Sequence, residues 1–428
     1  MQKYINPPKQ DWEGLLQRPP VDVSGLFDSV ATVLDDIARE GDTAIVRYSE
    51  KFDGYAGTNL VVSPEEFDIA EKQIPSELKQ AIQRAAYNID SFHKAQWQTA
   101  VKVETEPGVT CWQKSVPIEK VGLYIPGGTA PLFSTVLMLG IPARIAGCEE
   151  IVMCTPPGKT GIVNPAILYA AKTAGIKKVF KVGGIQAIGA MAYGTQTVPK
   201  VYKIFGPGNR YVTAAKQLIT IRGTAIDMPA GPSEVLVMAD DSANPAFVAA
   251  DLLSQAEHGA DSQVILLTNS PELLDATMAE IDKQVRQLPR EAGASSALSN
   301  SKAFLLPSVD VMMEMSNHYA PEHLILSVRN AGQLAERVRN AGSVFIGHYS
   351  PESAGDYASG TNHTLPTHGC ARAYSGVNLS SFLKKISFQE ITGEGLKSLG
   401  PVIEKMAEAE ELLGHKQAVS IRLEHLKS

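Results

Sequence analysis

Val121-Gly-Leu-Tyr-Ile125 is the first of four short apolar runs that decide the fold. The others are EIVMC at residues 150–154, KVFKV at 178–182 and VYKIF at 201–205. Segments with helical spacing of apolar residues lie between them, for example from Ile167 to Thr173. Short strands that alternate with helices predict a parallel sheet covered by helices on both faces.

A second series of strand-type runs follows at residues 234–238, 263–267, 323–327 and 343–346. Two α/β units are therefore expected rather than one, which also suits a chain of 428 residues. The patterns before residue 117 are mainly helical, and the charged stretch after about residue 378 predicts a helical arm.

Composition narrows the function classes. Hydrophobic residues make up 44% of the chain, charged residues 20%, and the formal net charge is −7. A negative chain without a basic cluster disfavours nucleic acid and anionic membrane surfaces as partners. The four cysteines are too few to crosslink a chain of this size and form no CxxC pair. We expect a cytoplasmic enzyme.

The strongest local signal for chemistry is the pair Gln255 and His258, three residues apart near the end of a predicted helix. Asn244 and Pro245 provide the pattern of a helix start, and Gly259 provides a stop. At this spacing the two side chains are expected to share one face and to bind a metal ion. An amide oxygen and one imidazole are too few ligands, so two more must come from elsewhere.

The dipeptide Glu322-His323, preceded by Pro321, stands directly before a strand-type run. In extended backbone the two side chains would point to opposite sides and act on different protons. Glutamate could activate water, and imidazole could accept a proton from an alcohol near neutral pH. For an isolated dipeptide, the alternative is a surface Glu beside a hydrogen-bonded His.

The polar segment 350–366 has little apolar content and is expected to be a long loop. Asp356 would add a carboxylate to the metal pair, and His363 could bind substrate or metal. An ordinary Asx turn at Asp356 is the alternative. Judged alone, His415 is expected to face solvent or to end a helix.

Three glycine-rich loops follow the strands of the first series, at residues 126–128, 183–186 and 206–209. Loops at strand carboxyl ends are where α/β sheets bind ligands, and glycine allows a close approach of the backbone. None is a GxGxxG motif, and simple tight turns remain the alternative.

Taken together, these motifs resemble the histidinol dehydrogenase family. The resemblance extends from near Asp22 to the C-terminal helix, and its six ordered motifs include the stretches ending at Asn209, His258, His323 and His363. It implies two Rossmann-like parallel-sheet domains with small helical N- and C-terminal segments. Residues 124–233 would be an inserted NAD-binding domain, and 23–123 with 234–377 would form one discontinuous domain that carries the metal site. Residues 1–22 and 378–428 would be the terminal segments.

The resemblance also implies a role for each matching residue. One zinc ion per subunit would be bound by Gln255, His258, Asp356 and His415, the last from the partner subunit of a homodimer with shared active sites. Glu322 and His323 would be the acid/base pair. Substrate contacts would come from the metal ligands and from Ser233, His323, His363 and Glu410, and NAD contacts from Tyr124, Gln186 and Asn209.

The implied reaction is the NAD-dependent four-electron oxidation of L-histidinol through L-histidinal to L-histidine, the last steps of histidine biosynthesis. Two other classes fit parts of the pattern. A zinc-dependent hydrolase would use Glu322 as general base and would need no dinucleotide loops. A zinc-dependent binding protein would bind its ligand without redox change.

Overall fold

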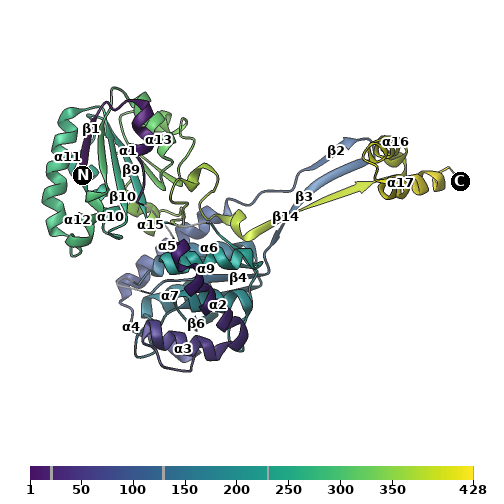
Figure 1. Ribbon diagram of the computed structural model, residues 1–428, viewed down its shortest axis with the longest axis horizontal. Helices are drawn as coiled ribbons and strands as arrows, with labels where there is room; N and C mark the ends of the chain where they lie inside the picture. Colours follow the sequence, from purple (N-terminus) through teal and green to yellow (C-terminus); the bar gives the residue numbers. More distant parts are fainter. Residues whose placement is uncertain (20–22, 128–130, 229–230, 428) are drawn as a thin grey trace. The chain divides into compact units, whose positions relative to one another are not determined.

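The structure is a computed structural model that describes residues 1–19, 23–127, 131–228 and 231–427. The chain divides into two compact units (Figure 1). The larger unit comprises Met1–Gln96 and Ile118–Phe382, and the smaller unit, here called the arm, comprises Trp97–Pro117 and Leu383–Ser428. The glycine-rich loop predicted at residues 126–128 includes Gly128, which lies outside the described residues. None of the described helices is long and apolar enough to cross a membrane.

The larger unit contains a six-stranded parallel sheet in the order β1-β11-β10-β9-β12-β13. Apolar residues on alternate positions face two separate cores, as the period of two in a strand requires. Helices cover both faces (Figure 1). The strands are β1 (Gln2–Ile5), β9 (Glu234–Ala239), β10 (Gln263–Thr268), β11 (Lys302–Leu305), β12 (His323–Ser327) and β13 (Ser343–Ile346). One face carries α10 (Pro245–Ala256), α11 (Pro271–Gln284) and α12 (Glu291–Ser299), and the other carries α1 (Trp12–Leu15), α13 (Val309–Tyr319) and α14 (Ala331–Ala335).

A five-stranded parallel sheet follows the order β6-β5-β4-β7-β8. Its strands are β4 (Lys120–Tyr124), β5 (Glu150–Thr155), β6 (Lys178–Lys181), β7 (Lys203–Phe205) and β8 (Ala225–Ile226). The connecting helices are α6 (Phe133–Ala146), α7 (Pro165–Ala174), α8 (Gly184–Tyr193) and α9 (Arg210–Ile221). Outside them lie four helices from the N-terminal region, α2 (Phe27–Glu40), α3 (Asp42–Asp53), α4 (Pro64–Gln73) and α5 (Ser76–Lys94).

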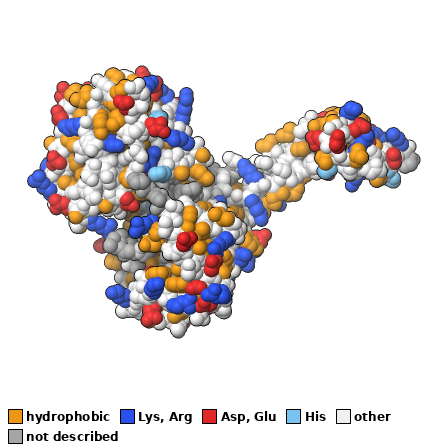
Figure 2. All heavy atoms as spheres, in the orientation of Figure 1, with side chains coloured by type: hydrophobic (Ala, Val, Ile, Leu, Met, Phe, Trp, Pro, Cys, Tyr) orange, Lys and Arg blue, Asp and Glu red, His pale blue; other side chains and the backbone are white. Residues whose placement is uncertain are grey.

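The arm is built from an antiparallel sheet in the order β14-β3-β2 and a pair of packed helices. Its elements are β2 (Lys102–Glu106), β3 (Val109–Pro117), β14 (Leu383–Ile391), α16 (Gly393–Ala409) and α17 (Leu413–His425). Apolar side chains lie along the exposed sheet, among them Val103, Ile386 and Phe388 (Figure 2). Over the larger unit, Lys and Arg side chains are interspersed with Asp and Glu on the face shown in Figure 2.

The predicted fold class is confirmed, because both strand series form parallel sheets that are covered by helices. One local prediction was wrong. Residues after 378 were expected to be helical, yet β14 pairs with β3 from Leu383–Pro117 to Ile391–Val109. The partner strand lies more than 250 residues earlier, so helical periodicity within the arm could not indicate this pairing.

The packing also divides the chain differently from the expected boundaries. Residues 23–123 were assigned to the discontinuous domain with 234–377, but α2 and α3 bury Val30, Leu34 and Ile45 in the core of the five-stranded sheet. Strand β4 of that sheet already begins at Lys120, and residues 97–117 belong to the arm. The apolar face of an amphipathic helix indicates that the helix packs against an apolar surface, but its sequence does not indicate which surface that is.

Candidate active site

The amino ends of β9 and β12 form the base of the candidate active site. Glu234 opens β9, and its backbone amide donates to Glu322 Oε2 at 2.8 Å. Its carbonyl oxygen lies 3.1 Å from Nδ1 of His323, the first residue of β12. The site therefore lies at the amino edge of the six-stranded sheet, whereas ligands of α/β sheets usually lie at the carboxyl edge.

Glu322 and His323 do not point to opposite sides as expected. Both side chains are buried, and Glu322 Oε2 lies 3.6 Å from His323 Nδ1. The reason is that Glu322 precedes β12 in a bend, so the alternation of an extended strand does not apply to it. The buried pair also rules out the surface alternative for this dipeptide.

A buried ion pair fixes the start of β9 and was not foreseen from the sequence. Arg18 donates from Nε to Glu234 Oε1 at 2.6 Å and from Nη2 to Oε2 at 2.8 Å. The backbone amide of His368 donates to the same carboxylate. A charged residue at the head of the apolar run 234–238 was the available signal, because a buried charge requires such partners.

Helix α10 delivers Gln255 to the site. Asn244 caps the helix through Ala246, with Pro245 at the first helical position, as predicted. The Gln255 side chain is fully buried; its Nε2 donates to the Glu234 carbonyl at 3.3 Å, and its Oε1 has no hydrogen-bond partner. However, α10 ends at Ala256, so exposed His258 lies beyond it and does not share a helix face with Gln255.

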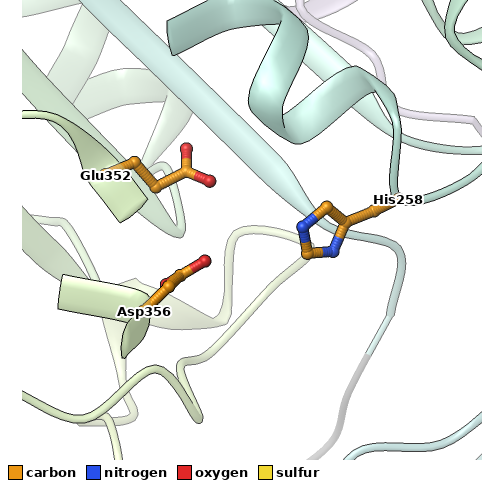
Figure 3. A group of neighbouring side chains, drawn as sticks. All are labelled: His258, Glu352 and Asp356. Atoms are coloured by element: carbon orange, nitrogen blue, oxygen red, sulfur yellow. The ribbon is translucent and has the colours of Figure 1, made fainter. Parts of the chain in front are cut away.

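Part of the predicted polar loop is a short helix, α15 (Glu352–Tyr357). Glu352 and Asp356 are four residues apart on it and point toward the His258 imidazole (Figure 3). One ligand atom from each of the three lies within 4.8 Å of the others, and the Oε2 atom of buried Glu352 has no hydrogen-bond partner. The sequence prediction missed Glu352.

Burial and charge perturb this cluster strongly. Burial raises the pKa of Glu352 to about 8. Burial by itself would lower the pKa of His323, but the carboxylates of Glu352, Glu322 and Asp356 outweigh it and raise that pKa well above its usual value. The His323 imidazole in turn outweighs burial at Asp356 and lowers the pKa of that carboxyl. Perturbed groups in a cleft are typical of functional sites.

Gln255, His258, Glu322, His323 and Asp356 line one cavity of about 170 Å³, whose lining does not include Glu352. Half-buried His363 also lines it, with Nδ1 2.8 Å from the Asp356 carbonyl oxygen and Nε2 3.1 Å from Thr135 Oγ1. The structure thus brings together most of the residues predicted for metal, substrate and catalysis, namely Ser233, Gln255, His258, Glu322, His323, Asp356 and His363.

Two predicted site residues belong to the arm. Glu410 follows α16, His415 lies in α17, and both are exposed. Their participation in a partner's site stays a prediction.

A second pocket, of about 620 Å³, lies at the carboxyl edge of the five-stranded sheet. It is lined by residues that end or follow β4, β5, β6 and β7, including Tyr124, Pro156, Gly184 and Asn209. The Gly184 amide donates to the Tyr124 hydroxyl at 3.1 Å, and Asn209 caps α9. Gln186 is buried in α8 behind this pocket. The glycine-rich loops therefore frame a ligand-sized pocket, as their position after the strands predicted.

A buried Glu–His pair in one cavity and a second pocket at the carboxyl edge of a parallel sheet fit the class of α/β enzymes. Residues 16–423 match the family model described as histidinol dehydrogenase. The chain belongs to the histidinol dehydrogenase family, a family of oxidoreductases in histidine biosynthesis.

Individual relatives agree. The chain is 60% identical over 428 residues to the histidinol dehydrogenase of Bacteroides thetaiotaomicron, covering 100% of both chains. It is 52% identical to that of Aliivibrio fischeri, covering 96% of this chain and 94% of the relative. The crystal structure of histidinol dehydrogenase from Elizabethkingia anophelis is similar with a TM-score of 0.97 and 57% identity, over 100% of this chain and 99% of that one.

Proposed function

We propose that this protein oxidises L-histidinol through L-histidinal to L-histidine, with two NAD molecules as electron acceptors and a zinc ion that positions the substrate. The proposal rests mainly on one cavity. Buried His323 and Glu322 line it together with the metal-capable side chains of Gln255, His258 and Asp356. The family membership supports the substrate.

The donor set fits zinc. Gln255 Oε1 is a buried oxygen without a partner, and His258 and Asp356 offer an imidazole nitrogen and a carboxylate oxygen. Nitrogen and oxygen ligands of this kind suit Zn²⁺. Gln255, His258 and Asp356 would hold the ion, with His415 of the partner subunit as fourth ligand. When bound, the zinc would orient the amine and imidazole of histidinol and offset the negative charge around His323.

Tyr124, Gln186 and Asn209 would hold NAD against the glycine-rich loops. When bound, NAD accepts a hydride from the carbinol carbon. Ser233, His363 and the partner's Glu410 would contact histidinol, which would fix the direction of its carbinol.

His323 would be the base for the alcohol. His323 Nδ1 lies 3.1 Å from the Glu234 carbonyl oxygen and 3.0 Å from Gln255 Nε2, and Nε2 lies 3.5 Å from Asp356 Oδ1. With the zinc charge offsetting the surrounding carboxylates, Nε2 would be the atom that accepts the proton. His323 would take the hydroxyl proton as the carbinol carbon loses its hydride, which yields the aldehyde.

Glu322 would act on the aldehyde. Its carboxylate is held by the Glu234 amide in the same cavity and would remove a proton from water as that water adds to the carbonyl carbon. The resulting hydrate would lose a hydride to a second NAD and a hydroxyl proton to His323, and ionisation of the carboxylic acid would give the carboxylate of histidine. The small volume of the cavity would help to retain the aldehyde between the two steps.

We further propose a cytoplasmic homodimer with shared active sites. Four unpaired cysteines fit a reducing compartment. The exposed apolar side chains of the arm fit an interface with a second copy.

The test is the amount of NADH formed per L-histidinol consumed, measured before chelation, after chelation and after return of zinc. Two NADH with zinc-dependent recovery are expected. One NADH would mean release of the aldehyde. No NADH, with hydrolysis of an amide or ester instead, would favour a zinc-dependent hydrolase that uses Glu322 as general base.

A further inference from the structure

The position of Asp53 disfavours the negative charge of its carboxylate. It is the last residue of α3, where the partial negative charge of the helix end opposes an anion, and it lines the pocket at the carboxyl edge of the five-stranded sheet. Burial raises its pKa. Among the described residues its one hydrogen-bond partner is Gln186, whose Nε2 donates to Asp53 Oδ2 at 3.1 Å. The fold itself gains little from this charge, which therefore points to a ligand.

The rest of the pocket has the chemistry of a nucleoside site. Its apolar walls are formed by Pro126, Pro156, Pro157, Ile162 and Ile167, and we call it the proline-walled pocket. Its volume of about 620 Å³ suits a nucleoside-sized group. Asp53 is the one carboxylate among the described residues that line it. A carboxylate is an acceptor for two neighbouring hydroxyl groups, as at the ribose of dinucleotides in other α/β folds.

The position of the pocket decides which half of NAD it can take. The reactive ring must reach the cavity that holds His323. The loop at residues 206–209 lines both pockets, since Gly206 and Pro207 contact that cavity and Asn209 contacts the proline-walled pocket. With the nicotinamide beside His323, the pocket that Asp53 and Asn209 line would hold the adenosine half.

We infer that Asp53 binds the 2′-hydroxyl of the adenosine ribose and thereby selects NAD over NADP. This inference rests on the proposed function. The free hydroxyl donates a hydrogen bond to the carboxylate, whereas the 2′-phosphate of NADP would place a second anion against it in a partly desolvated pocket.

The experiment compares NAD, NADP and 2′-deoxy-NAD as ligands and as electron acceptors for the intact enzyme, by calorimetry and by NADH or NADPH formation. The wild-type protein should prefer NAD to both analogues by about 10-fold or more. Asp53→Ala should bind NAD about 10- to 100-fold more weakly and should no longer distinguish it from 2′-deoxy-NAD, with little change in kcat. Asp53→Asn should lower the preference for NAD over NADP at least about 10-fold, because it removes the charge and keeps an acceptor for Gln186.

Glu50→Gln removes one charge from the exposed side of the same helix and should leave all three affinities unchanged. Thermal melting checks that each variant is folded. If Asp53→Ala weakens NAD and 2′-deoxy-NAD equally, so that their ratio stays at the wild-type value, Asp53 only positions Gln186 and the inference is overturned. Equal use of NAD and NADP by the wild-type protein would also overturn it. Absence of NAD binding by the wild-type protein would instead refute the proposed function.

Discussion

At the scale of the residue, the site depends on a few backbone atoms of Glu234. Its amide holds Glu322, and its carbonyl oxygen accepts from Gln255 and lies beside His323 Nδ1. Glu322, His323 and Gln255, the proposed catalytic pair and a proposed metal ligand, therefore share one anchor. The ion pair between Arg18 and the Glu234 side chain holds this anchor in place. Small displacements of this anchor would move all three groups together.

The division of labour between Glu322 and His323 gives the first prediction. Glu322→Gln keeps the size of the side chain and an acceptor for the Glu234 amide, but it removes the base for water. Aldehyde oxidation should fall about 100-fold or more, while alcohol oxidation should be largely retained. Stopped-flow NADH formation with histidinol and with histidinal separates the steps. An equal loss in both would contradict this assignment.

Glu352 gives a second prediction, concerning the metal. Its buried carboxylate lies in the same cluster as His258 and Asp356, so Glu352→Gln should weaken zinc binding by about 10- to 100-fold. The measurement is zinc retained per chain in competition with a chelator, without any activity assay. Glu257→Gln, next to His258 but outside the cluster, is the matched control. Equal zinc retention by both variants would remove Glu352 from the site.

At the scale of the element, side-chain hydrogen bonds hold the backbone of the turn after β7 in place. The Gly206 amide donates to Asp227 Oδ2 at 2.9 Å, and its carbonyl accepts from Lys216 Nζ at 2.9 Å. Lys216 and Asp227 are themselves paired at 2.5 Å with both side chains buried. The turn that lines both pockets is thus fixed from two sides.

Gly206→Ala tests this constraint. Gly206 has φ +133°, and an added Cβ would lie 2.1 Å from the Tyr124 carbonyl oxygen. We expect a loss of about 3 kcal/mol or more in the free energy of unfolding, with NAD binding also weakened. Gly223 has φ +98°, and a Cβ added there would meet no atom within 4 Å. Gly223→Ala therefore measures backbone strain alone and should lower the free energy of unfolding by about 1 kcal/mol. Denaturant unfolding of both variants makes the comparison, and similar losses would mean that the Tyr124 contact is unimportant.

At the scale of the whole molecule, the assignment of His415 to a partner's site can be tested by complementation. Chains with His415→Ala and chains with His258→Ala are each expected to be nearly inactive. If the arm of one subunit completes the site of the other, a mixed dimer has one site without either change and should regain up to about half of the wild-type activity per dimer. Tagged heterodimers purified from co-expression provide the measurement. No recovery in a verified heterodimer would mean that each site uses its own chain.

The pH dependence of stability is a second property of the whole molecule. Burial raises the pKa of Asp251 in α10 to about 7, compared with about 3.9 for an unfolded aspartate. The folded state holds this proton more tightly, so the free energy of unfolding should fall as pH rises from about 4 through about 7.

In the metal-free protein, Asp251→Asn should make the free energy of unfolding less dependent on pH. Melting temperatures between pH 5 and pH 8 provide the comparison, and exposed Asp282→Asn on α11 is the control. A wild-type slope in Asp251→Asn would show that other groups cause the pH dependence.

The sequence by itself predicted eight of the eleven strands of the two parallel sheets, because the period of apolar residues depends on local geometry, but β1, β8 and β11 were not predicted. Strand β12 begins and ends where predicted, and Asn244 caps α10 as predicted. Most of the polar residues that line the cavity were also singled out from the sequence, because carboxylate, amide and imidazole side chains near predicted strand and helix ends are candidates for chemistry.

Only the tertiary structure decided which surfaces meet. It joined α2 and α3 to the five-stranded sheet, paired β14 with β3, turned Glu322 toward His323 and added Glu352 to His258 and Asp356. It also put the cavity at the amino edge of the six-stranded sheet. The physical reason is that local periodicity fixes which face of an element is buried, whereas the partner of that face depends on shape and packing between distant segments.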